Sequence, residues 1–226
     1  MKRVRRTLFR YHVWLGWLVG IPLLLWTVSG LVMVAWPIEQ VRGTDLRAEL
    51  PPLPAATVYP PAIHGAADSL TLKQTALGPR WIVALGETRY AADPRDGSKL
   101  AALDRAGAVS AALGYRKPPA HVASARYSAA EHPPLDLRQP RPAWAVRFTD
   151  GARFYIDADT GELIAVRTDF WRFYDVMWGL HIMDLQGRED THHPILIIFA
   201  GISALAAVLA VLLMIARYAP LRRKSR

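Results

Sequence analysis

The chain contains two long apolar stretches without a charged residue: VWLGWLVGIPLLLWTVSGLVMVAW at residues 13–36 and PILIIFAGISALAAVLAVLLMIA at residues 194–216. Each exceeds the roughly 20 residues that a helix needs to cross about 30 Å of hydrocarbon. Because lipid offers the backbone no hydrogen-bonding partners, segments of this kind form helices in a membrane. The sequence therefore predicts an integral membrane α-helical protein with two transmembrane helices.

Positive charge flanks both stretches on their outer ends and predicts the orientation of the chain. Ten of the 28 Lys and Arg residues lie in residues 1–12 and 217–226, which contain no Asp or Glu. Basic flanks stay on the cytoplasmic side, so both termini are expected in the cytoplasm and the middle of the chain in the periplasm. The excess charge then reflects orientation in the cytoplasmic (inner) membrane and attraction to an anionic lipid bilayer, and nucleic acid is not an expected partner.

A cleaved signal peptide is the alternative explanation of residues 13–36. The apolar stretch is about twice as long as a usual signal-peptide core, and no convincing small-x-small cleavage site follows it, which favours an uncleaved anchor. The chain has no cysteine. Disulfides, Cys-ligated metal sites and covalent haem attachment are therefore excluded, and any haem would be held non-covalently.

The region between the two stretches contains a repeated pattern. WIVAL at 81–85 precedes DPRDG at 93–97, and WAVRF at 144–148 precedes DADTG at 157–161. Each copy is typical of two strands followed by an Asp-rich turn that Gly closes. Residues 37–168 are long enough for one ordinary domain.

Two further elements are expected between the copies. Residues 104–113 are Ala-rich with helical spacing, and Asp104 and Gly114 suit the start and the end of such a helix. Residues 121–127 are typical of another strand. Each repeat would then place a helix on a small antiparallel sheet, so we expect an α+β extracytoplasmic domain of two repeats. The helix of the first repeat has no clear sequence signal.

The spacing of Asp157, Asp159 and Gly161 is similar to the start of a calcium-binding loop. An EF-hand that starts at Asp157 requires Gly at its sixth position and Glu at its twelfth. This chain has Glu162 and Thr168 there. We therefore predict a turn in which Asp side chains bind the local backbone.

Several stretches together resemble the PepSY-associated transmembrane proteins. The stretch WAV at 144–146 followed by YIDADTGEL at 155–163 resembles the closing strands of a PepSY domain. The other matching stretches are RYHVWLG at 10–16, Ser29-Gly30, WGLH at 178–181 and HHP at 192–194. The resemblance covers most of the chain and implies a periplasmic PepSY domain held by membrane helices, here in a short form with two spans.

The resemblance also implies two classes of function. Larger relatives with four spans include haem-b-containing reductases linked to iron–siderophore uptake, and other PepSY proteins are proposed peptidase inhibitors or regulators. The chain is thus either a component of transmembrane electron transfer with a ferric-siderophore partner, or a non-enzymatic module that captures a periplasmic peptide or protein. It carries no nucleotide-binding fingerprint, so no NAD or flavin site is expected, and no catalytic motif decides whether it is an enzyme.

Four histidines are the candidate cofactor-binding residues: His12, His181, His192 and His193. His12 shares a helix face with Gly16 and Gly20, which suits either helix packing or an axial ligand beside a flat porphyrin. The other three are expected at the outer membrane boundary, where an amphipathic helix with polar residues at the headgroups is the alternative to a haem or metal site. An apolar stripe predicts that helix, formed by Phe170, Tyr174, Met177, Trp178 and His181.

The membrane separates His12 from the other three histidines by about 30 Å. They cannot bind the same iron, so haem b would require a homodimer or another membrane subunit. The expected organisation is a basic tail (1–12), a transmembrane helix (13–36), the periplasmic PepSY-like domain (37–168), an interfacial helix and loop (169–193), a second transmembrane helix (194–216) and a second basic tail (217–226).

Overall fold

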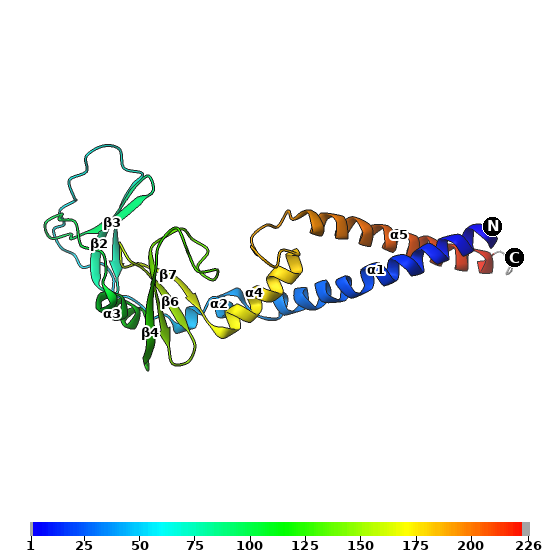
Figure 1. The fold of residues 1–226 in the computed structure, drawn as a ribbon, viewed down its shortest axis with the longest axis horizontal. Coiled ribbons are helices and arrows are strands. Elements are labelled where there is room, and N and C mark those ends of the chain that lie inside the picture. The colour runs from blue at the N-terminus through cyan, green and yellow to red at the C-terminus, as the bar shows by residue number, and fades with distance from the viewer. Residues whose placement is uncertain (1, 223–226) are drawn as a thin grey trace. The chain divides into compact units, whose positions relative to one another are not determined.

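The computed structural model describes the backbone of residues 2–222 and the side chains of residues 6–217 (Figure 1). The chain divides into two compact units. The helical unit comprises Met1–Trp36 and Phe173–Arg226, and the sheet unit comprises Pro37–Arg172. Residues 223–226 of the predicted second basic tail lie outside the described residues.

Two long helices that pack against each other form most of the helical unit, α1 (Lys2–Ala35) and α5 (Pro194–Arg222). The start of α1 and the end of α5 lie at the same end of this unit (Figure 1). Within them, Arg6–Ala35 and Pro194–Arg217 are long and apolar enough to cross a membrane. Large apolar side chains on both are exposed, which is unfavourable in water and accommodated by lipid.

The bounds of α1 differ from the predicted span. The helix begins at Lys2 rather than at residue 13, because no Pro or Gly interrupts residues 2–12 and Lys and Arg are good helix formers. It ends at Ala35, one residue before Trp36. A third helix, α4 (Asp169–Ile182), is followed by a loop at residues 183–193, and its residues from Phe173 onward belong to the helical unit.

Two antiparallel sheets form the sheet unit. The first has the order β1-β2-β3 and the second the order β4-β5-β6-β7. All neighbouring strands pair in antiparallel fashion. The expected mixed α/β content is therefore present. The strands are β1 (Ser69–Thr75), β2 (Gly78–Leu85), β3 (Thr88–Ala92), β4 (Val122–Ser128), β5 (Ala143–Phe148), β6 (Arg153–Asp157) and β7 (Leu163–Arg167).

The sequence repeat corresponds to two similar hairpins, β2–β3 and β5–β6. The first strand of each hairpin carries a tryptophan whose indole N–H donates to a backbone carbonyl outside the hairpin. Trp81 Nε1 lies 2.9 Å from the Tyr59 oxygen, and Trp144 Nε1 lies 2.9 Å from the Leu103 oxygen. The predicted pair of strand–turn–strand units is thus confirmed by the pairing of the strands.

Within residues 2–222, a helix covers the second sheet but not the first. In the first repeat, the structure describes a short helix α2 (Ile38–Val41), a 3-10 turn at Thr44–Leu46, and no helix in residues 47–68. The expectation of one helix per repeat is therefore wrong for the first repeat. The physical reason is the five prolines of this segment, which remove backbone donors and favour extended chain. They are Pro51, Pro52, Pro54, Pro60 and Pro61.

The helix of the second repeat is α3 (Arg105–Tyr115), and it forms the main core with the second sheet. Asp104 caps it as predicted, since Oδ1 accepts the Gly107 N–H at 2.7 Å. The helix continues one residue past Gly114, the predicted end. A Cβ at Gly114 would lie 2.9 Å from the Ala76 Cβ, so this glycine allows close packing. The buried core residues are Ala111, Ala112, Tyr115, Val146, Phe148, Ala152, Phe154, Ile156 and Val166.

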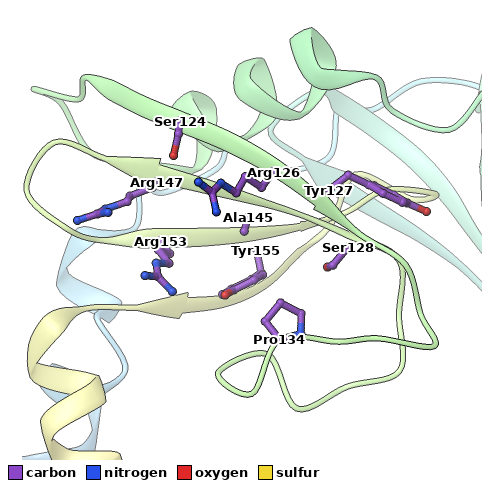
Figure 2. Close-up of a pocket in the computed structure, with 9 residues that line it drawn as sticks. All are labelled: Ser124, Arg126, Tyr127, Ser128, Pro134, Ala145, Arg147, Arg153 and Tyr155. Carbon is purple, nitrogen blue, oxygen red and sulfur yellow. The ribbon is translucent and has the colours of Figure 1, made fainter.

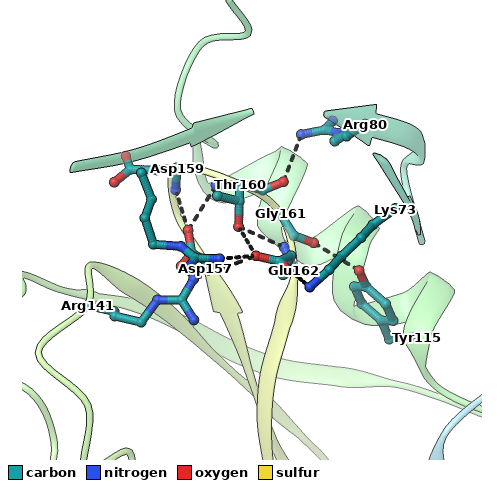
Figure 3. Close-up of polar contacts among 10 residues, drawn as sticks. Lys73, Arg80, Tyr115, Arg141, Asp157, Asp159, Thr160, Gly161 and Glu162 are labelled. Carbon is teal, nitrogen blue, oxygen red and sulfur yellow. Dashed lines mark hydrogen bonds and ion pairs between the residues drawn. The ribbon is translucent and has the colours of Figure 1, made fainter. Parts of the chain in front are cut away.

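The Asp157–Gly161 segment is the predicted turn, and it also joins the two sheets (Figure 3). Asp157 Oδ1 accepts the backbone N–H groups of Asp159 and Thr160 at 3.0 and 2.9 Å, and Gly161 has φ +77°. The next residue, Glu162, accepts hydrogen bonds from Lys73 on β1 at 2.9 Å and Arg89 on β3 at 3.0 Å. The turn thus positions one carboxylate against both outer strands of the first sheet.

Candidate functional site

His181, near the end of α4, packs against α1 inside the apolar segment of that helix. Its ring stacks on the Trp26 ring, with centroids 4.7 Å apart and an interplanar angle of 13°. Gly30 leaves room for this approach, because a Cβ there would lie 2.9 Å from His181 Cε1. Two stretches that were matched separately in the sequence, Ser29-Gly30 and WGLH at 178–181, therefore meet at one contact.

The contacts of His181 Nδ1 favour a proton on that ring nitrogen. Nδ1 lies 3.1 Å from the Trp26 carbonyl oxygen and 3.2 Å from Ser29 Oγ. The Ser29 hydroxyl donates to the same Trp26 carbonyl at 2.9 Å, so its oxygen is free to accept. Both neighbours of Nδ1 can then accept, and the Trp26 carbonyl can only accept, so we assign the proton of a neutral ring to Nδ1. Nε2 consequently presents a lone pair.

The loop after α4 holds the end of this helix in place. Arg188 Nη1 lies 2.6 Å from Asp175 Oδ2, and the Trp178 indole N–H donates to the Arg188 carbonyl at 2.9 Å. A Cβ at Gly179 would lie 3.0 Å from the Asp184 carbonyl oxygen, so glycine is needed where the loop crosses α4. Trp178 and Gly179 therefore support the loop, while His181, one turn further on, contacts α1.

Asp184 organises the same loop. Its side chain accepts backbone N–H groups from Gly187, Glu189 and Asp190 at 2.9, 3.1 and 3.2 Å. Burial of this carboxylate opposes its ionisation, but the backbone N–H donors outweigh that effect and lower the pKa of Asp184 to about 2. The carboxylate of Asp184 is therefore ionised at neutral pH, and the backbone N–H groups of the same loop bind it.

The other three candidate histidines, His12, His192 and His193, do not share contacts with His181. His12 and His193 each have a buried Nδ1 without a hydrogen-bond partner. The exposed His192 has its Nδ1 3.4 Å from Thr191 Oγ1. All side-chain partners that the structure gives His181 are on α1. Among the described residues, no group of three or more His, Asp or Glu side chains could hold a metal ion.

The surroundings of His181 are those that a metal-ligating histidine needs, but no second histidine contacts it among the described residues. A histidine ligand needs a neutral ring whose second N–H is held by an acceptor, commonly a backbone carbonyl. The Trp26 carbonyl provides that arrangement. His12 precedes Ser29 on α1 by 17 residues, which corresponds to about 25 Å along a helix. His12 therefore cannot share an iron with His181 of the same chain.

The sheet unit contains a groove on the face of the second sheet that α3 leaves open (Figure 2). Its volume is about 320 Å³, and residues of β4, β5 and β6 line it together with Pro134. Figure 2 shows the side chains of Arg126, Arg147 and Arg153 on this face, and none of them is among the candidate residues predicted from the sequence. The strand alternation of Arg147 and Arg153 with buried phenylalanines is the signal that places both on the face opposite the core. We call this surface the arginine face; its residues are Ser124, Arg126, Ala145, Arg147, Arg153 and Tyr155.

Sequence reasoning also missed Trp26 and Ser29 as partners of His181. The available signal was the polar Ser29 inside an apolar helix, a position where polar residues usually serve a specific contact. No family model, no curated protein and no solved structure matches this chain.

Proposed function

We propose that the chain is a two-pass protein of the cytoplasmic membrane that binds haem b and takes part in outward electron transfer. In this proposal both termini are cytoplasmic, and the sheet unit is a PepSY-like domain in the periplasm. The basic flanks support the orientation, and the exposed apolar surfaces of α1 and α5 support insertion. The resemblance suggests a ferric siderophore as the final electron acceptor.

The observation that carries the proposal is the hydrogen bonding of His181. The Trp26 carbonyl and Ser29 hold Nδ1–H and leave Nε2 available as a ligand atom. Stacking on Trp26 limits rotation of the imidazole ring. Haem b, when bound, would supply a one-electron redox centre, while Trp26 and Ser29 orient the His181 ring. A polar contact inside an apolar helix costs free energy, so its presence usually indicates a functional role.

In this proposal a second ligand to the iron would come from outside the chain, since His12 is too far along α1 and the contacts of His181 include neither His192 nor His193. A Cβ at Gly16 or Gly20 would meet nothing within 4 Å, so the helix face that they share with His12 is open to another helix. Two copies with two spans each would form a four-helix membrane bundle. We therefore propose a homodimer, or a complex with another membrane subunit, as the haem-binding form.

Absorption spectra of the detergent-purified protein, produced with ample haem, test this function. We expect a Soret band and α band typical of bis-histidine haem in the dimeric fraction. His181→Ala should remove both bands, whereas His64→Ala in the sheet unit should retain them. A haem-free wild-type protein would exclude the proposal, and a monomer with a bis-histidine spectrum would exclude ligation between chains.

A second function, a binding module tethered by two helices, is favoured by the open groove of the sheet unit. This function needs no redox centre, because the ligand contacts only the sheet unit and the helices act as an anchor. The haem-free His181→Ala variant in nanodiscs distinguishes the two. If this haem-free variant binds a ligand of the sheet unit with the affinity of the wild type, binding does not depend on haem. That result would support the tethered module.

A further inference from the structure

The arginine face carries more positive charge than the described residues neutralise. In the strand register, Arg147 on β5 lies directly opposite Arg153 on β6. Like charges at directly opposite positions destabilise a sheet. Asp136 compensates Arg153, with Oδ2 3.1 Å from its Nη1. Neither Arg147 nor Arg126 forms an ion pair or side-chain hydrogen bond within the described part of the chain, and both are exposed.

The groove between Arg126 and Arg147 has room for a small ligand next to the sheet. Ser124 pairs with Arg147 across β4 and β5, and Arg126 pairs with Ala145 in the adjacent row. The small Ala145 side chain leaves space between the two guanidinium groups, which lie on the same face in Figure 2. The groove volume of about 320 Å³ is within the range of small-ligand sites, about 300–1,000 Å³.

On the β6 side of the groove, the polar groups of Tyr155 and Arg153 already have a partner in Asp136. The Tyr155 hydroxyl donates to Asp136 Oδ1 at 2.5 Å, and its side chain is 1% exposed. Burial and the neighbouring Asp136 carboxylate both raise the pKa of Tyr155, so it stays neutral. Because Asp136 is engaged by both Tyr155 and Arg153, it does not neutralise the two exposed arginines.

We propose that the arginine face binds a small ligand through an oxyanion group, a carboxylate or a phosphate. Arg126 and Arg147 donate charge-assisted hydrogen bonds to the oxyanion, and the Ser124 hydroxyl donates a further hydrogen bond to it. Paired guanidinium groups suit this chemistry, because each presents a planar fork of donors that matches two oxygens. The inference gives the tethered binding module a small ligand in place of the peptide or protein that the resemblance implies, so it rests on that second function and is independent of haem.

Calorimetric titration of the full-length protein in nanodiscs of neutral phosphatidylcholine tests the proposal. The probes are citrate for carboxylates, inorganic phosphate for phosphates, and nanodiscs that contain phosphatidylglycerol for a lipid headgroup. We expect citrate or phosphate to bind at low salt and to bind more weakly as salt increases. Stronger binding of one probe assigns the oxyanion, and inhibition of that binding by phosphatidylglycerol identifies the headgroup as a competing source of the same group.

The variants separate a specific site from net charge. Arg126→Gln and Arg147→Gln should each weaken binding about tenfold or more, as expected for loss of a charge-assisted contact. Arg147→Lys, which keeps the charge but loses the fork, should fall between the wild type and Arg147→Gln. The matched control is Arg105→Gln, which removes one exposed charge from α3 and should leave affinity unchanged.

Two results would overturn the proposal. One is equal affinity in the wild type and in the Arg126→Gln/Arg147→Gln double variant, provided that thermal unfolding shows both to be folded. The other is the absence of any heat of binding with millimolar citrate or phosphate at low salt. Absorption spectra of the same variants keep the functions apart, because a retained Soret band with lost anion binding would leave the haem proposal intact.

Discussion

The β2–β3 and β5–β6 hairpins make closely similar local contacts but have different cores. The Asp-rich turn that follows each hairpin closes with a glycine at positive φ, +73° at Gly97 and +77° at Gly161. The second hairpin lies under α3, where Phe154 is fully buried and packs edge-on against Phe148 at 5.2 Å. The corresponding Tyr90 remains half-exposed beside Lys99. Local sequence therefore sets the hairpin, and the covering element sets how much it buries.

The segment that covers the first hairpin is extended chain rather than a helix. The Tyr59 N–H donates to the Pro94 carbonyl at 2.8 Å, and the Trp81 indole donates to the Tyr59 carbonyl. In the second hairpin, the residue that accepts from tryptophan is Leu103, just before α3. An extended chain offers fewer apolar side chains to a sheet than a helix does, so we expect the first hairpin to be the less stable one.

Truncation of the matched aromatic side chains Phe154 and Tyr90 should show the largest difference in stability between the hairpins. Phe154→Ala should lower the free energy of unfolding of the sheet unit by about 3–5 kcal/mol, because it leaves a cavity under α3. Tyr90→Ala should cost about 1 kcal/mol, since that side chain is only partly buried. Denaturant unfolding of the full-length protein in detergent, followed by tryptophan fluorescence, measures both. Equal losses would contradict the difference in burial.

Substitution of Gly97 or Gly161 by alanine should destabilise the two hairpins to different extents, by a smaller difference than the aromatic truncations. Both substitutions place a Cβ at positive φ, which costs about 1–2 kcal/mol. At Gly97 the new Cβ would also lie 2.8 Å from the Pro60 carbonyl oxygen, whereas at Gly161 the nearest atom is the movable Arg80 Nη1 at 3.1 Å. We expect Gly97→Ala to be the more destabilising, with faster hydrogen exchange confined to β2 and β3.

Glu162→Gln should weaken the connection between the two sheets by about 1 kcal/mol, since its partners Lys73 and Arg89 are partly exposed. Burial raises the pKa of Glu162, but hydrogen bonds from Lys73 and Arg89 outweigh it and leave the pKa below the ordinary value of 4.5. The ion pairs therefore stabilise the unit above that pH, and this contribution is lost as pH falls through the lowered pKa.

Unfolding curves at several pH values check this prediction. The difference in stability between the wild type and Glu162→Gln should be largest near neutral pH and should disappear in acid below the pKa of Glu162. A difference that persists at pH 2 would show that the substitution acts through packing rather than through the charge of the carboxylate.

Arg147→Gln should have the smallest effect, and its sign is informative. Removal of one of two opposed arginines relieves repulsion with Arg153 and should stabilise the sheet unit by a few tenths of a kcal/mol. Arg153→Gln is the matched contrast, because it leaves the Asp136 carboxylate without its cation and should cost about 1 kcal/mol. Thermal unfolding of both variants measures the difference. Destabilisation by Arg147→Gln would indicate that this arginine has a structural role.

Much of the candidate site could be predicted only as separate pieces. The sequence indicated His181 and the Ser29-Gly30 pair as notable residues, yet 152 positions separate His181 from Ser29, the residue that it contacts. No periodicity connects residues so far apart. The arginine face could be predicted one strand at a time, because alternation places Arg147 and Arg153 opposite the core. Its charge balance depends on Asp136, which a loop brings back over the sheet.

The sequence by itself determined the features that arise within a few neighbouring residues. These are the two apolar helices, the paired hairpins, the Asp104 cap and the Asp157–Gly161 turn, all of which follow from side-chain period and local hydrogen bonding. The tertiary structure decided the rest. It sets which repeat a helix covers, which groups contact His181 Nδ1, and which arginines have no carboxylate partner among the described residues. Those outcomes depend on contacts between distant segments, and such contacts form only when the chain has packed.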